Sequence, residues 1–207
     1  MPRDTHRIET RRDRLVLVGV DTPGADLPIE DSLGELARLV DTAGADTAGS
    51  ISQQRPAPHQ ATYVGKGKLL EIERWVTELT ADGIVCDDEL SPAQMRNLEE
   101  TLRCKVLDRT MVILDIFSQH ALSKEGALQV ELAQQRYRLS RLIGAGKAMS
   151  RLGGGSAVAG PGGGIGARGP GEKKLETDRR HIRVRLHQLR AELKEVAQRR
   201  ERMREQR

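Results

Sequence analysis

The feature that most constrains the fold is a stripe of mostly aliphatic side chains, spaced alternately four and three residues apart, in two long stretches. Residues 110–143 contain no Pro and a single Gly, and residues 172–204 contain neither. The spacing lays one apolar seam along each helix, as in a coiled coil. At about 1.5 Å per residue the second helix would be roughly 50 Å long. We therefore predict a long antiparallel two-helix coiled-coil hairpin. Its stripes are Leu128, Leu132, Gln135, Leu139 and Leu142, and Ile182, Leu186, Leu189, Leu193 and Val196.

A glycine-rich segment, residues 144–170, separates the two stretches. It has 11 Gly among 27 residues and no acidic residue. A helical hairpin needs a connection of only about 2–8 residues, so the excess length indicates a further role. Free backbone N–H groups and basic side chains suit contact with RNA phosphates and bases. The alternative is a flexible linker with incidental charge. The predicted RNA contacts here are Lys147, Arg151, Gly163, Gly164, Gly166, Arg168 and Gly169.

Charge is distributed unevenly along the chain. Residues 1–120 carry 14 Lys and Arg against 21 Asp and Glu, a net −7, whereas residues 121–207 carry 20 against 9, a net +11. An acidic body with a basic appendage indicates a polyanionic partner. An interfacial membrane helix would need Trp or Phe anchors that the narrow stripe lacks. The second helix extends the predicted RNA contact, unless it is a solvated face with internal ion pairs. Its charge run is Lys173, Lys174, Arg179, Arg180 and Arg183, with Arg185 beside them.

Residues 14–109 alternate short apolar runs with amphipathic stretches. Such alternation predicts an α/β fold with a small, mostly parallel four-stranded sheet flanked by helices. Aromatic residues make up only 2% of the chain, so the core must be aliphatic. Residues 1–13 are predicted to be a disordered tail, and residues 110–207 the hairpin subdomain. The expected strands are 14–20, 46–53, 83–86 and 105–107, and the expected helices are 31–39, 65–80 and one that begins after Ser91.

Local signals place several helix ends. Asp31 or Ser32 can cap the first helix, and Gly44 can stop it. Ser91 before Pro92, with Gln94 in the first turn, is typical of a helix start.

The body offers two weak ligand signals. Lys66 and Lys68, in a Gly-Lys repeat before a helix, resemble a phosphate-binding turn, although no Walker A string occurs. Residues 87–89 (DDE) follow a predicted parallel strand, where a divalent ion or simply a solvated turn is expected. The sequence shows no catalytic constellation and no metal-ligand spacing. Cys86 and Cys104 lie far apart, and no signal peptide or membrane-spanning run occurs, which indicates a cytoplasmic protein with reduced thiols. We expect the chain to be a monomer.

Six motifs resemble the N-terminal region of HflX-type ribosome-associated GTPases. The resemblance extends over residues 14–200. They are YVGK (63–66), DDELSPAQMRNLEE (87–100), KVLDRTMVILDIF (105–117), EGALQVELAQ (125–134), GGIGARGPGE (163–172) and LETDRRHI (175–182).

The resemblance implies both a fold and a function. It implies a small α/β subdomain and a long helical hairpin placed before a Ras-like GTPase domain. It also implies binding to rRNA of the large (50S) ribosomal subunit, with the hairpin tip near the peptidyl-transferase centre, and splitting or rescue of stalled ribosomes under stress. GTP and Mg²⁺ would belong to the GTPase domain, and this fragment would need no cofactor.

Two departures from the family pattern concern the hairpin. Residues 152–162 (LGGGSAVAGPG) lengthen the tip, and Ser140 stands where proline is expected. Two other functions stay open from the sequence. One is a nucleotide-binding α/β module that uses Lys66, Lys68 and residues 87–89, with a passive helical arm. The other is an oligomerising coiled coil.

Overall fold

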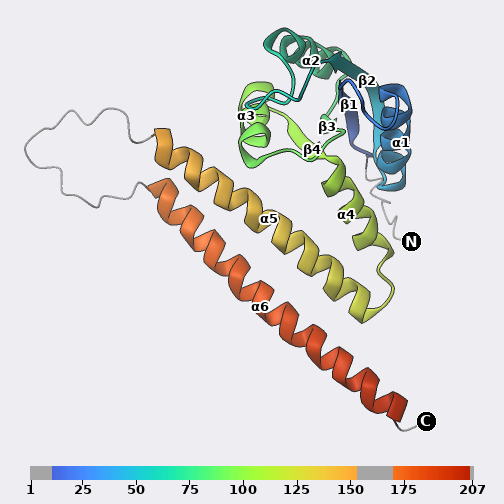
Figure 1. Ribbon diagram of the computed structural model, residues 1–207, viewed down its shortest axis with the longest axis vertical. Coiled ribbons are helices and arrows are strands. Elements are labelled where there is room, and N and C mark those ends of the chain that lie inside the picture. The colour runs from blue at the N-terminus through green and yellow to red at the C-terminus, as the bar shows by residue number, and fades with distance from the viewer. Residues whose placement is uncertain (1–10, 153–169, 206–207) are drawn as a thin grey trace, which may run out of the picture.

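A computed structural model describes residues 11–205 except 153–169, and the side chains of residues 11–142 and 175–205. An α/β body carries a long pair of helices along one side (Figure 1). The predicted tail, residues 1–13, lies largely outside the described part. So do residues 153–169 of the predicted glycine-rich segment.

Four strands form the sheet of the body: β1 (Arg14–Asp21), β2 (Asp46–Gln54), β3 (Gly83–Cys86) and β4 (Lys105–Asp108). Their order is β2-β1-β3-β4, and each neighbouring pair is parallel. The predicted strands and the parallel sheet are confirmed. A Cβ at position 83 would lie 2.3 Å from the Lys105 carbonyl oxygen, so the close approach of β3 and β4 requires glycine there.

Helices cover both faces of the sheet: α1 (Ile29–Thr42), α2 (Lys66–Glu78), α3 (Pro92–Leu102) and α4 (Arg109–His120). Val16 and Val18 of β1 pack in the core beneath α2 and α3. Leu15 and Leu17 point to the other face, beneath α1 and α4. This alternation follows from the two-residue period of a strand, and the buried cluster on each face is almost wholly aliphatic.

The caps of two helices were predicted, with different outcomes. At α3, Ser91 Oγ accepts from the Gln94 amide and the Gln94 side chain accepts from the Ser91 amide, so the predicted start is confirmed as a capping box. The predicted cap of α1 is wrong, because that helix begins earlier, after Pro28. The Asp31 and Ser32 amides both donate to the Pro28 carbonyl, and the Ser32 hydroxyl turns to Asp87 instead.

The stretch 110–143 divides into two helices, although one unbroken helix was compatible with its sequence. Helix α4 ends at His120, and α5 (Lys124–Leu152) begins after a corner at residues 121–123. The Ser123 hydroxyl accepts from the Gly126 amide at 3.0 Å and so caps α5. The predicted division of the chain at residue 109 falls at the start of α4, whose Val112 and Ile116 pack against the sheet.

Helices α5 and α6 (Pro170–Glu205) lie side by side and antiparallel (Figure 1). Because α5 continues to Leu152, the glycine-rich connection is shorter than the predicted 144–170, and Gly144 and Gly146 belong to the helix. Leu128, Leu186 and Leu189 of the predicted stripes are buried. Whether the two helices wind about each other as a coiled coil stays a prediction.

Candidate nucleic-acid interface

The hairpin is fixed to the body by Asp108, a carboxylate at the end of β4 that is 0% exposed. Its Oδ1 accepts from the Met111 amide at 2.9 Å and so caps α4. Its Oδ2 accepts from the Leu90 amide at 3.1 Å, from the Tyr137 hydroxyl and from Arg141 Nη2 at 2.5 Å. Since Tyr137 and Arg141 belong to α5, one buried carboxylate joins the sheet, α4 and the first helix of the hairpin.

Arg141 strengthens this junction in two further ways. Its guanidinium lies 4.3 Å from the ring centroid of Tyr137, a cation–π distance. Its Nη1 also donates to the sulfur of Met95, in α3. Burial, followed by the hydrogen bond to Asp108, raises the pKa of Tyr137 well above its usual value, so this hydroxyl stays a donor.

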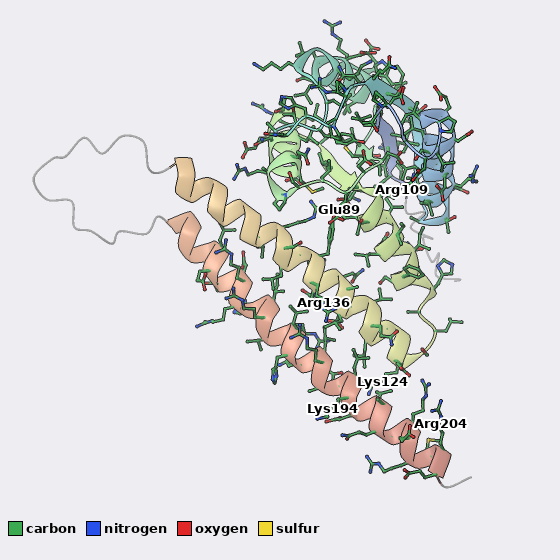
Figure 2. The ribbon with its side chains drawn as sticks, in the orientation of Figure 1. Glu89, Arg109, Lys124, Arg136, Lys194 and Arg204 are labelled. Atoms are coloured by element: carbon green, nitrogen blue, oxygen red, sulfur yellow. The ribbon has the colours of Figure 1, made fainter. Side chains whose placement is uncertain are left out.

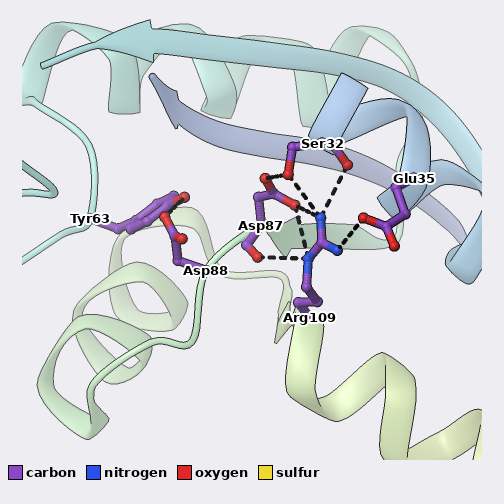
Figure 3. Close-up of polar contacts among 6 residues, drawn as sticks. All are labelled: Ser32, Glu35, Tyr63, Asp87, Asp88 and Arg109. Carbon is purple, nitrogen blue, oxygen red and sulfur yellow. Dashed lines mark hydrogen bonds and ion pairs between the residues drawn. The ribbon is translucent and has the colours of Figure 1, made fainter. Parts of the chain in front are cut away.

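A second polar network occupies the carboxyl edge of the sheet (Figure 3). Arg109 donates to Asp87 Oδ1 at 2.5 Å, to Glu35 at 3.0 Å and to the Ser32 hydroxyl at 3.0 Å. The Ser32 hydroxyl in turn donates to Asp87 at 2.6 Å. Burial lowers the pKa of Arg109, but the hydrogen bonds with Asp87 and Glu35 outweigh it and raise the pKa overall.

Asp88 is occupied in the same way. The buried Tyr63 hydroxyl donates to it at 2.7 Å, and burial, followed by the charge of Asp88, raises the pKa of Tyr63. Asp87 is therefore a buried hydrogen-bond acceptor, whereas Asp88 and Glu89 are exposed, as expected of a solvated turn. No group of three or more His, Cys, Asp or Glu within the described residues could hold a metal ion.

Lys66 and Lys68 lie at the start of α2. Lys66 is exposed, and Lys68 forms an ion pair with Glu71 at 2.7 Å, one turn along the same helix. The amide of Gly65, the cap residue, is taken by the Gln53 side chain at 2.8 Å. Nucleotide binding by Lys66 and Lys68 therefore stays a prediction.

Polar contacts tie α6 to α5 along the hairpin. Arg185 forms a two-point ion pair with Glu131, at 2.6 and 2.7 Å, and this hydrogen bonding lowers the pKa of Glu131. Arg200 contacts Glu125 at 3.0 Å. Arg179 donates to the Leu142 carbonyl at 2.7 Å. Because residue numbers fall along α5 as they rise along α6, the contacts define an antiparallel register.

The predicted RNA contacts fall into three groups. Gly163, Gly164, Gly166, Arg168 and Gly169 lie outside the described residues, and the side chains of Lys147, Arg151, Lys173 and Lys174 are not described either. Arg179 is only 19% exposed and is held by Leu142 and by Glu176 at 3.6 Å, so RNA contact by its guanidinium stays a prediction. Arg180 and Arg183 are exposed, with Arg183 at 4.0 Å from Glu176.

Sequence reasoning missed the side chains that position the hairpin, which are Asp108, Tyr137 and Arg141, and it missed Arg109 in the network at the sheet edge. Their long-range side-chain partners lie 22 to 77 residues away along the chain, and no local pattern marks such a pair. A usable signal existed for Asp108 alone, since an Asp that directly precedes a helix is a common N-cap.

Two family models together match most of the chain. Residues 30–118 match the GTP-binding GTPase N-terminal family, and residues 120–207 match the GTP-binding GTPase middle region. The chain is 54% identical over 195 residues to GTPase HflX of Lacrimispora saccharolytica, covering 94% of this chain and 44% of that protein. It is 44% identical over 182 residues to GTPase HflX of Escherichia coli, covering 88% and 40%. This chain thus spans less than half the length of these relatives.

Solved structures agree with the fold. A GTP-binding protein from Sulfolobus solfataricus in complex with GDP matches with a TM-score of 0.58 at 20% identity, over 90% of this chain and 46% of that one. The SsGBP and GDP complex matches with a TM-score of 0.64, also at 20% identity, over 92% and 46%.

The chain belongs to the HflX family of GTP-binding GTPases and corresponds to its N-terminal part. No helix among the described residues is long and apolar enough to cross a membrane.

Proposed function

We propose that this chain is a ribosome-binding module that binds rRNA of the large ribosomal subunit through its basic hairpin and glycine-rich segment. In this proposal GTP and Mg²⁺ bind to the part of the longer relatives that this chain does not match, and hydrolysis there is coupled to splitting or rescue of stalled ribosomes in the cytoplasm. The observation that carries the proposal is a basic hairpin fixed to an acidic body through a buried carboxylate.

Charge and shape support an RNA partner. The hairpin half carries a net +11 and the body half a net −7, so a polyanion is drawn to the hairpin and repelled by the body. The end of α5 and the start of α6 lie beyond the body, at the left of Figure 1. A partner can therefore meet this end of the hairpin without contacting the sheet.

The proposal is tested by binding of the chain to large ribosomal subunits across a salt series. Removing Arg151 and Arg168 together, as Arg151→Ala and Arg168→Ala, is expected to weaken binding about tenfold, because two phosphate contacts are lost and the salt dependence becomes shallower. A matched control is Arg38→Ala with Arg74→Ala, which removes two exposed arginines from the body. Equal affinities of both double variants and the wild type would contradict a role of the glycine-rich segment in binding. If the wild type does not bind the large subunit, the proposed function itself is wrong.

A further inference from the structure

Several basic side chains of the hairpin line one side of it. On α6 they stand one position after successive stripe residues: Arg183 follows Ile182, and Arg190 follows Leu189. His187 and Lys194 continue the series. At 3.6 residues per turn, one position is a rotation of about 100°, so these side chains form a row beside the seam. In α5, Arg136 likewise follows the stripe position Gln135.

The Arg185–Glu131 ion pair shows how the two helices are oriented. Arg185 stands one position before Leu186, and Glu131 one position before Leu132, yet the two side chains meet at 2.6 Å. In an antiparallel pair, the same rotation from each seam therefore leads to the same side of the hairpin. Positions one after the seam must share the opposite side, which places Arg136 on the side of the α6 row. The contacts of Arg179 and Arg185 put Arg136 near the level of Arg183.

We call this side the basic face, defined by Arg136, Arg183, His187, Arg190 and Lys194. All five side chains are exposed. Of these five, Arg183 forms an ion pair with a described acidic side chain, Glu176, at 4.0 Å. The other side of α6 is different, since positions 188, 192 and 195 are Gln, Glu and Glu, and Arg185 is neutralised by Glu131.

We propose that the basic face binds the phosphate backbone of an RNA duplex. The inference rests on the proposed function and assigns to it a surface distinct from the glycine-rich segment. From Arg183 to Lys194 the face runs about 16 Å along a straight helix, which suits a regular backbone. Duplex RNA is recognised mostly through its shape, phosphates and 2′-hydroxyls. Single-stranded RNA is usually held by stacking on aromatic side chains, and this face has none.

The test compares two double variants of one helix that remove equal charge. Arg190→Gln with Lys194→Gln strips part of the basic face. Arg199→Gln with Arg202→Gln removes two exposed arginines that stand outside the row. None of the four side chains forms an ion pair with a described residue, so stability should change little in either variant. Circular dichroism melting verifies that both fold.

Binding of each protein to a short blunt-ended RNA duplex is measured across a salt series, alongside binding to large ribosomal subunits. The basic-face variant is expected to bind the duplex about tenfold more weakly, with a shallower salt dependence, whereas the control stays within about twofold of the wild type. Equal losses in both variants, or a wild type that does not bind the duplex, would overturn the inference. If the variant lacking Arg190 and Lys194 binds large subunits as tightly as the wild type does, the inference is also overturned, but the proposed function stands. If the wild type binds the duplex but not the subunit, the proposed function fails instead.

Discussion

At the scale of single residues, Asp108 shows how a buried charge can serve architecture. An ionised carboxylate in a protein interior is costly unless hydrogen bonds and a partner charge satisfy it. Here both oxygens are satisfied by two backbone amides, the Tyr137 hydroxyl and the Arg141 guanidinium. Because these donors come from three segments, the carboxylate holds together parts of the chain that no continuous helix or strand connects.

Replacing this carboxylate should reveal its role. In Asp108→Asn the amide nitrogen replaces one of the two oxygens and cannot accept the hydrogen bonds donated to that position. The negative charge that balances Arg141 is also lost. We expect a loss of about 3 kcal/mol in the free energy of unfolding, as when one partner of a buried ion pair is removed. Urea unfolding followed by circular dichroism measures it. Asp26→Asn, at an exposed position, is the control, and a cost no greater than that of the control would show that Asp108 is dispensable.

At the scale of elements, the sequence predicted those helix starts and strands that depend on neighbouring residues alone. The Ser91, Pro92 and Gln94 signals predicted the start of α3. Apolar runs, and for β2 a weak alternation, predicted the four strands. The corner between α4 and α5 was not predicted, because residues 121–123 contain neither Gly nor Pro. That corner satisfies tertiary packing: α4 lies on the sheet, while α5 must leave it to reach α6.

For the site, sequence predicted the basic character of the hairpin but not its internal arrangement. Arg179 and Arg180 are adjacent and identical, yet one is held inside the hairpin and the other is exposed. Which arginine faces a partner depends on the rotation of α6 relative to α5. The identity of the two residues does not reveal that rotation, but the contacts between the paired helices do.

The pairing of α5 and α6 should depend on pH through Glu131. Its pKa is lowered in the folded chain from the model-compound value of 4.5, because Arg185 hydrogen-bonds the charged form. A lowered folded pKa means that this stabilisation is present above about pH 5 and is lost as pH falls from the unfolded pKa through the folded one. The difference in Tm between wild type and Glu131→Gln should therefore be largest near neutral pH and shrink in acid. A difference that stays constant from pH 7 to pH 3 would contradict this assignment.

At the scale of the whole molecule, the hairpin and the body move as one rigid body only if their junction is stiff. Arg141 contacts Asp108, Tyr137 and Met95 at once, so it links α5 to the end of β4 and to α3. A surface far out on α6 can then transmit force to the sheet, because the first helix of the hairpin does not turn freely about the corner at residues 121–123.

Loosening this junction should broaden the distances between body and hairpin. Spin labels at Asp26→Cys and Lys194→Cys, in a Cys104→Ser background, report that distance, since Cys86 is buried. We expect Arg141→Ala to widen the distance distribution measured by pulsed electron resonance. Arg138→Ala, a nearby exposed arginine of α5, should leave it unchanged. Distributions of equal width in both variants would mean that other contacts hold the hairpin.

The network around Arg109 has a consequence for how such a module can be controlled. In open parallel sheets, ligands usually bind outside the carboxyl ends of the strands. Here that place holds a guanidinium from the chain itself, bonded to Asp87, Glu35 and Ser32, with Tyr63 closing on Asp88 beside it. Arg109 is tethered and does not exchange with solution, so a ligand could take this place only by displacing the guanidinium from these hydrogen bonds.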